Sequence, residues 1–395
     1  MNIAIIGGSL SGAYIGHLLG LEGFSVTLFD GKAPYEKPCG GGITYHTVSE
    51  FPFLKESNIL INPIHRAELI SHDDYSFEMV LNHPIYICSR KKLAEYLLNM
   101  AIKSNVKVVS QKVLDIMENN STIHLATKNN NYDFDFIIGA DGARSMVRRC
   151  MKGKFPSNYY AITLGYYLLG KWENKIILKF HKNLKGYTWI FPREDHVSIG
   201  IGSMVGSVTT KELKLELNNF LLKEYPNIKL SEAAYYSAFI PSLPAYYLNS
   251  LKCSGNNWAL IGDAAGFADP ITGEGIYYAL KSAEILSKCI IQNKIEEYDF
   301  RWKKAFGNEL QKSASLSSIF FNNQFTESMI LMASKSKTIK NIVSDLLTGQ
   351  QSYITLKDRL RSQITNCICE SMIHSDFALN KRLLKNLNNI RSNLF

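Results

Sequence analysis

The sequence predicts an α/β fold, in which a Rossmann-like nucleotide-binding domain carries an inserted, mainly antiparallel β-sheet and a helical C-terminal region. Three observations indicate this class. The first thirty residues alternate between strand, helix and strand patterns. Residues 159–203 form a run of short strands separated by turns. From residue 299 onward the apolar spacing is helical, with few Pro or Gly.

The N-terminal segment has the order of a parallel βαβ unit. Residues 2–7 form a short apolar strand, residues 11–21 a helix, and residues 24–29 a second strand. The turn after the first strand has the sequence GGSLSG. A dinucleotide-binding turn needs its first glycine for a tight bend and its last for close helix–strand packing, and the pyrophosphate lies at the helix N-terminus.

Two residues complete this pattern. Ser9 replaces the middle glycine of the usual motif, and its small side chain still lets a phosphate approach. Asp30 ends the second strand, eighteen residues after Gly12, where an acid binds ribose hydroxyls. The residues predicted to bind the nucleotide here are Gly7, Ser9, Leu10, Ser11, Gly12, Asp30, Gly31 and Lys32.

The rest of the chain continues the alternation. We expect a helix over residues 90–104, strands over 106–110, 122–127, 134–140 and 258–262, and a long helix from about residue 275. Four strands follow one another in the inserted sheet, with the sequences YYAITLGYYLL, KIILKFH, GYTWIFP and VSIGIG.

Two further motifs follow buried strands. GADGARS spans residues 139–145, and IGDAAGFADPITGEG spans residues 261–275. Asp263 ends its strand, where it is well placed for a second ribose or phosphate-linked contact. Gly273 and Gly275 open a helix whose N-terminus offers N–H groups to an anion or a polarised carbonyl.

Together these motifs resemble the flavoprotein family that includes aromatic hydroxylases and geranylgeranyl reductases. The resemblance spans about residues 1–290 and includes Arg90, which opens the helix RKKLAEYLLNMA. It implies FAD as the cofactor, with Arg90 near the FAD, Asp263 at the ribityl–pyrophosphate region and residues 273–275 along the isoalloxazine ring. It adds these cofactor-binding residues: Gly40, Gly41, Gly42, Arg90, Asp141, Gly262, Asp263, Pro270, Gly273, Glu274, Gly275 and Ile276.

One segment is specific to a branch of this family. EKPCGGGI, residues 36–43, is similar to the P-x-x-K-P-C-G-G-G signature of geranylgeranyl reductases, and GYTWIFP is similar to a strand that faces their substrate cavity. The resemblance implies that the glycines lie against the flavin or the substrate channel and that Cys39 is the catalytic residue. It implies a substrate-facing role for three aromatic residues, Tyr187, Trp189 and Phe191.

These residues also have structural interpretations. Cys39 is either a small buried hydrophobe or a thiol activated by its surroundings, with Lys37 nearby. Tyr187 and Trp189 either pack a sheet or form the apolar wall that a prenyl chain needs. The residue types leave both interpretations open.

The expected function is reduction of a carbon–carbon double bond in an isoprenoid or other hydrophobic substrate, by hydride transfer from reduced FAD. The external electron donor is NAD(P)H or ferredoxin. The alternative is a flavin-dependent monooxygenase or halogenase of an aromatic or polyketide-like substrate, since the fold does not separate these activities. The tryptophan-rich W-x-W-x-I-P signature of halogenases is not present in the sequence. A flavin-binding redox carrier is a further alternative from a different class.

Composition limits the partners. The net charge is +9, and Lys and Arg are dispersed, which suits a substrate with a diphosphate or phospholipid headgroup; we expect a hydrophobic small-molecule or lipid substrate and no nucleic acid. Seven scattered cysteines fit a reducing cytoplasm, and no apolar run is long enough to span a bilayer. No metal site is expected, because Cys367 and Cys369 match no zinc spacing. The basic stretch over residues 380–395 is either a solvated helix or a peripheral contact with a membrane surface.

The predicted domains are discontinuous. The FAD-binding domain takes residues 1–65, 88–155 and 253–298, and the substrate-binding β-sheet domain takes residues 66–87 and 156–252. The helical C-terminal region takes residues 299–395.

Overall fold

The computed structural model describes residues 1–373 apart from 57, 58, 60, 61, 120 and 121. Its chain forms two compact units. Unit 1 contains Met1–Lys37, Ser89–Tyr160 and Phe239–Ala314, and unit 2 contains Pro38–Cys88, Ala161–Ala238 and the described chain from Ser315 on. Residues 38–56 pack with unit 2 and residues 239–252 with unit 1, while the predicted division into three regions stays a prediction.

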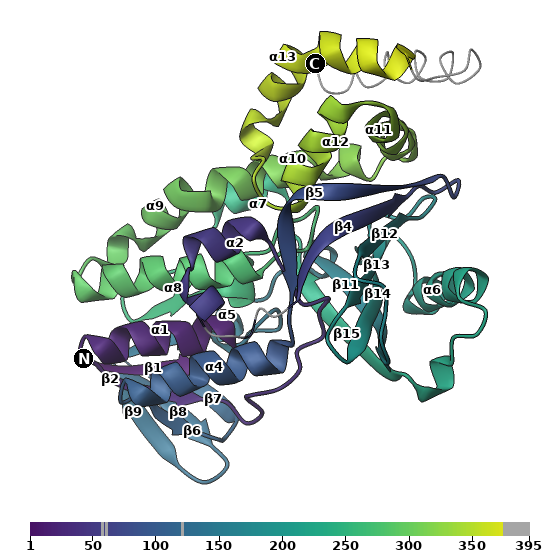
Figure 1. Cartoon of the computed structure of the whole chain (residues 1–395). Coiled ribbons are helices and arrows are strands. Elements are labelled where there is room, and N and C mark those ends of the chain that lie inside the picture. Colours follow the sequence, from purple (N-terminus) through teal and green to yellow (C-terminus); the bar gives the residue numbers. More distant parts are fainter. Residues whose placement is uncertain (57–58, 60–61, 120–121, 374–395) are drawn as a thin grey trace. The chain divides into compact units, whose positions relative to one another are not determined.

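Unit 1 is built on a five-stranded parallel sheet with the strand order β16-β10-β1-β2-β6. Its strands are β1 (Asn2–Ile6), β2 (Ser25–Phe29), β6 (Lys107–Val109), β10 (Phe136–Gly139) and β16 (Trp258–Leu260). The helices are α1 (Leu10–Leu21), α4 (Arg90–Lys103), α5 (Met146–Met151), α7 (Ala245–Ser250), α8 (Ile276–Ile291) and α9 (Tyr298–Trp302). In Figure 1, α1 lies beside α4 and α8, and contacts join α1 to both helices.

The same unit carries a small antiparallel sheet. It consists of β7 (Val113–Asn119), β8 (Thr122–Thr127) and β9 (Asn131–Phe134). In β8, buried side chains alternate with half-buried ones, as expected for a sheet with one face more open to solvent. Short 3₁₀ turns occur at Ser157–Tyr159, Gly262–Ala264 and Ile295–Glu297, and a π-helical turn at Lys303–Gly307 follows α9.

Unit 2 is built on an eight-stranded sheet with the order β15-β11-β14-β13-β12-β4-β5-β3. The pairs β11–β14, β14–β13, β13–β12, β4–β5 and β5–β3 are antiparallel, whereas β12 and β4 run parallel. Its strands are β3 (Gly42–Ile43), β4 (Pro63–Ile70), β5 (Ser76–Ile87), β11 (Tyr160–Leu169), β12 (Ile176–Phe180), β13 (Tyr187–Pro192), β14 (His196–Met204) and β15 (Ala234–Pro241).

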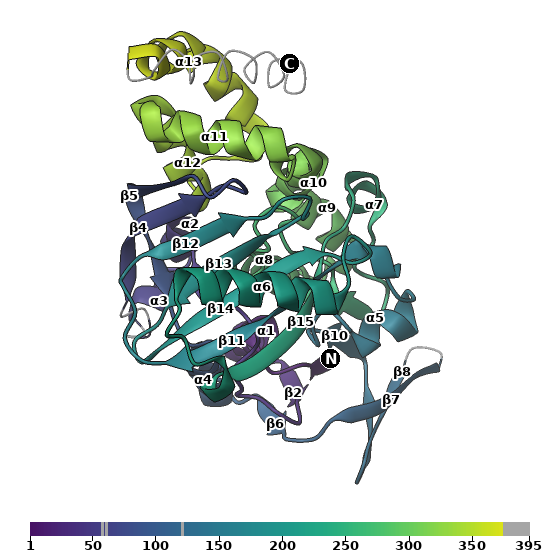
Figure 2. The ribbon, with the colours of Figure 1, turned by 90° about the vertical axis from the view of Figure 1, so that its right-hand side faces the viewer.

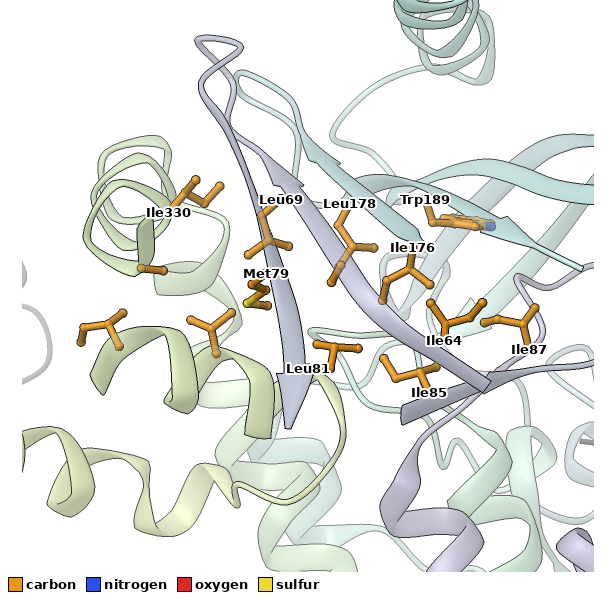
Figure 3. Packing of buried hydrophobic residues seen from close by; sticks show 14 of the residues in the cluster. Ile64, Leu69, Met79, Leu81, Ile85, Ile87, Ile176, Leu178, Trp189 and Ile330 are labelled. Atoms are coloured by element: carbon orange, nitrogen blue, oxygen red, sulfur yellow. The ribbon is translucent and has the colours of Figure 1, made fainter. Parts of the chain in front are cut away.

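Helices cover both faces of this sheet. Leu213, Leu217 and Phe220 of α6 (Thr210–Glu224) pack with buried residues of β11 to β14, and Figure 2 shows α6 in front of β13 and β14. On the other face, α11 (Asn323–Lys335) and α12 (Lys337–Leu347) contribute Ile330 and neighbouring residues to a second cluster with β4, β5, β12 and Trp189 (Figure 3). The remaining helices are α2 (Tyr45–Glu50), α3 (Phe53–Glu56), α10 (Asn308–Phe320), α13 (Tyr353–Ile373) and the 3₁₀ turn Leu230–Glu232.

The predicted fold class is confirmed. The parallel sheet has its glycine turn where it was expected, the second sheet is mainly antiparallel, and from Tyr298 the described chain is helical. The basic stretch 380–395 and the side chains of Cys367 and Cys369 lie outside the described residues. Among the described residues, no helix is both long enough and apolar enough to cross a membrane.

Candidate active site

The glycine turn after β1 has almost no room for side chains. Gly7 has φ +106°, and a Cβ there would lie 2.4 Å from the carbonyl oxygen of Ala140. A Cβ on Gly12 would lie 1.9 Å from the carbonyl oxygen of Gly7. The first glycine therefore allows the tight bend and the last allows α1 to pack on the strand, which are their roles in a dinucleotide-binding turn.

The N-terminus of α1 is suited to an anion. Ser9 is the N-cap residue, yet its side chain makes no capping hydrogen bond in the described structure, and the first turn contains no acidic residue. The first N–H groups of the helix and the positive end of its dipole thus meet no carboxylate of that turn. Leu10 and Ser11 are buried at the start of the helix. These features fit the pyrophosphate of a dinucleotide such as FAD.

Asp30 lies at the end of β2 and holds this turn in place. Its Oδ2 accepts a hydrogen bond from the Gly8 amide at 2.7 Å, and its Oδ1 accepts from the amides of Lys32 (2.7 Å) and Ala33 (3.0 Å). Each carboxylate oxygen has two lone pairs, so these bonds leave acceptor capacity for ribose hydroxyls. Asp30 therefore links the glycine turn to the segment that contains Gly31 and Lys32.

The other two motifs of unit 1 meet this turn. A Cβ on Gly7 would lie 2.9 Å from the Cα of Asp141, the second residue after β10. A Cβ on Gly262, which follows β16, would lie 3.1 Å from the hydroxyl oxygen of Ser11. Asp141 Oδ2 accepts from the Met146 amide at 2.6 Å, and burial raises the pKa of this carboxyl. The ends of β1, β10 and β16 thus meet at the carboxyl edge of one parallel sheet, where such folds bind ligands.

Asp263 forms an ion pair with Lys37, with Nζ 2.6 Å from Oδ2. Both side chains are largely buried, and a Cβ on Gly275 would lie 3.1 Å from Asp263 Oδ1. The sequence suggested Lys37 as an activator of Cys39, whereas in the structure its ammonium group binds this carboxylate. The predicted contact of Asp263 with the cofactor stays a prediction.

The loop before α8 is ordered by Asp269, a residue to which the sequence assigned no role. Its buried Oδ1 accepts from the amides of Ile271 and Thr272, both at 2.8 Å, and burial raises its pKa. Gly273 has φ +71°, and its amide donates to the Asp269 carbonyl at 2.8 Å. This network fixes the turn that contains Pro270 and Glu274 and leads into Gly275 and Ile276 at the start of α8.

Arg90 is buried at the first position of α4. Glu36 binds this helix start: its Oε1 accepts from the Arg90 amide at 3.0 Å, and its Oε2 accepts from Ser89 Oγ at 2.7 Å and the Lys91 amide at 3.1 Å. An acid at a helix N-terminus is favourable because of the helix dipole. Glu36 and Lys37 thus fasten the chain to unit 1 directly before it passes into unit 2 at Pro38.

The CGGG segment lies in unit 2, and the structure gives a different reason for two of its glycines. A Cβ on Gly40 would lie 2.5 Å from the Phe191 ring. Gly41 has φ +84°, and a Cβ there would lie 2.4 Å from the carbonyl oxygen of Cys88. Gly42 pairs with Ile87 as part of β3. Cys39 is partly exposed, and its Sγ accepts from the Gly41 amide at 3.3 Å.

Tyr187, Trp189 and Phe191 lie on the same face of β13, because alternate residues of a strand share a face. Trp189 is buried in the second cluster of unit 2 (Figure 3), and its ring centroid lies 6.2 Å from that of Tyr187. Tyr187 and Phe191 are partly buried and pack against the same cluster. Among the described residues, the indole Nε1 of Trp189 is buried without a hydrogen-bond partner. Gly200 makes room for this ring, since a Cβ there would lie 2.2 Å from it. The packing role is therefore present, and the substrate role stays a prediction.

Outside these residues, the described part of unit 2 contains one group with metal-ligand atoms close together. His72, Asp73 and Glu327 place one such atom each within 4.8 Å of one another. Nε2 of His72 lies 3.5 Å from Asp73 Oδ1, and Nδ1 lies 3.5 Å from Glu327 Oε2. Both distances are typical of ion pairs.

Sequence comparison finds relatives that are named as reductases of geranylgeranyl compounds. No model of a known protein family matches the chain. The chain is 26% identical over 373 residues to geranylgeranyl diphosphate reductase of Synechocystis, over 85% of this chain and 89% of the relative. It is 25% identical over 351 residues to digeranylgeranylglycerophospholipid reductase of Methanospirillum hungatei, over 81% and 85% of the two chains.

Solved structures share the fold. A geranylgeranyl bacteriochlorophyll reductase-like protein from Thermoplasma acidophilum has a TM-score of 0.75 at 19% identity, over 91% of this chain and 98% of the other. A flavin-dependent brominase has a TM-score of 0.68 at 15% identity, over 92% and 99%.

The glycine turns at the ends of parallel strands and the sequence relatives define the chain as an FAD-dependent oxidoreductase. Within this class, it is similar to the geranylgeranyl reductases over most of its length. The resemblance inferred from the motifs is therefore confirmed.

Proposed function

We propose that the protein reduces carbon–carbon double bonds of an isoprenoid substrate. The observation that carries this proposal is the KPCGGG segment, in which a partly exposed thiol lies on the Gly41 amide and aromatic residues of β13 pack against Gly40. Relatives named geranylgeranyl diphosphate reductase and digeranylgeranylglycerophospholipid reductase align with most of the chain and support it. The external electron donor would be NAD(P)H or ferredoxin.

Residues of unit 1 would hold the cofactor. The turn from Gly7 to Gly12 and the N-terminus of α1 would bind the pyrophosphate, and Asp30 would bind the ribose hydroxyls. When bound and reduced, FAD would supply the hydride for one carbon of the double bond. The ordered loop before α8 would direct its N–H groups to the polar edge of the isoalloxazine ring.

Cys39 would act as the general acid. Its Sγ–H would donate a proton to the second alkene carbon, so that hydride and proton together saturate the bond. The thiolate left on Sγ would be stabilised by the Gly41 N–H, 3.3 Å away, and would regain a proton from solvent. Each turnover would then need two electrons from the external donor to reduce the flavin again.

The substrate would be apolar with an anionic headgroup. Tyr187, Trp189 and Phe191 would form an apolar wall for the prenyl chain. The net charge of +9 favours a diphosphate or phospholipid headgroup. A reducing, cytoplasmic location would suit the scattered cysteines of the sequence, with peripheral contact to a membrane as the route to a lipid.

Anaerobic reoxidation of the chemically reduced protein tests this function. Geranylgeranyl diphosphate is added, oxidised-flavin absorbance is followed, and the product is identified by mass spectrometry. We expect reoxidation without oxygen and a product heavier by two hydrogens for each bond reduced. The fully saturated phytanyl analogue is the matched control and should leave the flavin reduced. A flavin that stays reduced until oxygen enters, with an oxygenated product, would instead favour the monooxygenase alternative.

A further inference from the structure

The backbone of Cys39 is held by three side chains of unit 2, which come from Tyr167 of β11, Arg193 of the turn after β13 and Ser198 of β14. The Cys39 carbonyl oxygen accepts from Arg193 Nη2 at 2.9 Å and from Ser198 Oγ at 3.0 Å. The Cys39 amide donates to the hydroxyl of Tyr167 at 3.3 Å. Both polar groups of Cys39 are therefore fixed by residues at least 128 positions away in the sequence.

These anchors are themselves buried and supported. Arg193 and Ser198 are almost completely buried. The Arg193 amide donates to the His196 carbonyl at 2.7 Å, which closes the turn between β13 and β14. Its guanidinium lies 5.0 Å from the ring centre of Tyr167. Ser198 Oγ lies 3.1 Å from the hydroxyl of the buried Tyr236. A charged guanidinium is costly to bury, so the hydrogen bonds that Arg193 makes here are needed to offset the loss of hydration.

The segment needs anchors from outside because it cannot order itself. Three consecutive glycines lose more backbone entropy on folding than any other residues, and they restrict their own rotation least. The Cys39 thiol meets the Gly41 amide only while the Cys39–Gly40 peptide, which lies between them, keeps its orientation. Two hydrogen bonds to the Cys39 carbonyl fix that orientation.

We propose that Arg193 and Ser198 are positioning residues, which hold the Cys39–Gly40 peptide so that the thiol stays on the Gly41 amide. This proposal rests on the proposed role of Cys39 as proton donor. It assigns to Arg193 the support of the thiol that the sequence suggested for Lys37.

The test combines two readouts on the full-length holoenzyme. The first is the rate of Cys39 alkylation by iodoacetamide, resolved by peptide mass spectrometry, which needs no substrate. The variants are Arg193→Met, Arg193→Lys and Ser198→Ala. We expect at least about fivefold slower alkylation in Arg193→Met and Ser198→Ala, because the amide no longer stabilises the thiolate, and partial recovery in Arg193→Lys.

Matched controls separate this effect from general loosening. Arg66→Met removes an exposed arginine of the same unit, and Ser203→Ala removes a buried hydroxyl of the same strand, β14. Both should alkylate Cys39 within about twofold of wild type, with bound FAD unchanged. If Arg193→Met does not fold, Ser198→Ala still tests the proposal.

The second readout is turnover of geranylgeranyl diphosphate in a double-mutant cycle. We expect Ser198→Ala and Arg193→Met to lower kcat about tenfold with KM within about twofold, and to have no further effect in a Cys39→Ser background. Equal losses in both backgrounds, or unchanged alkylation of Cys39, would overturn the proposal. If wild type reduces no alkene, the proposed function fails and the alkylation rates still decide the positioning roles.

Discussion

Each residue of the run Gly40 to Gly42 is small for its own reason. Gly41 combines a φ of +84° with a carbonyl oxygen 2.4 Å from the position of a Cβ, so any other residue is both strained and obstructed. At Gly42 the φ is ordinary, and the nearest atom to a Cβ is on the Phe191 ring at 3.1 Å. A side chain at Gly42 therefore needs only a small shift of a ring.

This contrast predicts different effects of the same substitution. We expect Gly41→Ala to destabilise the protein by about 3 kcal/mol, from backbone strain and overpacking. Gly42→Ala should cost less than about 1 kcal/mol, and it is the matched control. Thermal unfolding followed by circular dichroism measures both. Equal melting temperatures for the two variants would contradict the explanation based on positive φ.

The residues that sequence reasoning missed lack a motif. Arg193 and Ser198 become meaningful only because β13 and β14 place them beside Cys39, and Gly200 only because Trp189 packs over it. Asp269 is the exception, because an Asp side chain commonly accepts hydrogen bonds from the backbone amides two and three residues later and so forms a turn.

At the scale of elements, α1 offers a test of cofactor binding that separates it from stability. Asp is as good an N-cap as Ser, and a carboxylate suits a helix N-terminus. Ser9→Asp should therefore leave the melting temperature of the FAD-free protein unchanged or raised. The same carboxylate would occupy the α1 amides and repel phosphate.

We accordingly expect Ser9→Asp to weaken FAD binding at least about tenfold, or about 1.4 kcal/mol, measured by fluorescence titration of the FAD-free protein. Ser9→Gly restores the usual glycine pattern and should bind FAD within about threefold of wild type. Wild-type affinity in Ser9→Asp would show that the N-terminus of α1 does not bind the phosphates.

The turn between β4 and β5 is held to two other elements by Asp74. Its carboxylate bonds to Lys179 of β12 and, at 2.5 Å, to Lys223 of α6. Hydrogen bonds from these two ammonium groups lower the pKa of Asp74 from 3.8 to about 2. Because the folded-state pKa lies below the unfolded one, the stabilisation is fully present above the unfolded value and is lost as the pH falls towards 2.

We expect Asp74→Asn to be less stable than wild type by about 1 kcal/mol between pH 5 and 7, a value reduced because Asp74 is half exposed. The difference should shrink as the pH is lowered through 4 towards 2, measured by urea unfolding. Glu224→Gln removes an exposed carboxylate 3.8 Å from the same Lys223 and should show no such trend. A pH-independent difference for Asp74→Asn would contradict the assignment.

At the scale of the whole molecule, the net charge of +9 affects substrate capture. Salt screens long-range attraction between a basic protein and an anion. Because of this screening, we expect kcat/KM for geranylgeranyl diphosphate to fall about fivefold between 20 and 300 mM NaCl. Geranylgeraniol has the same chain without charge and should vary by less than about twofold. An equal salt response for both substrates would argue against electrostatic capture.

The sequence by itself determined the features that are encoded locally. Strand, glycine turn, helix and acid follow one another within thirty residues, and the apolar period and the glycine positions are enough to predict β1, α1 and β2. The order of the later motifs identified the flavoprotein class, and helical spacing predicted the described C-terminal helices. Each of these depends on residues only a few positions apart.

Only the tertiary structure decided which side chains surround the reactive ones. The side chains that bind the backbone of Cys39 come from 128 to 159 residues away, and Lys37 contacts Asp263 across 226 residues. These meetings follow from strand order, such as the parallel pairing of β12 with β4, in which a one-residue change of register would turn every side chain to the other face. No local pattern encodes such a pairing, because it is the burial of both faces of the completed sheet that selects it.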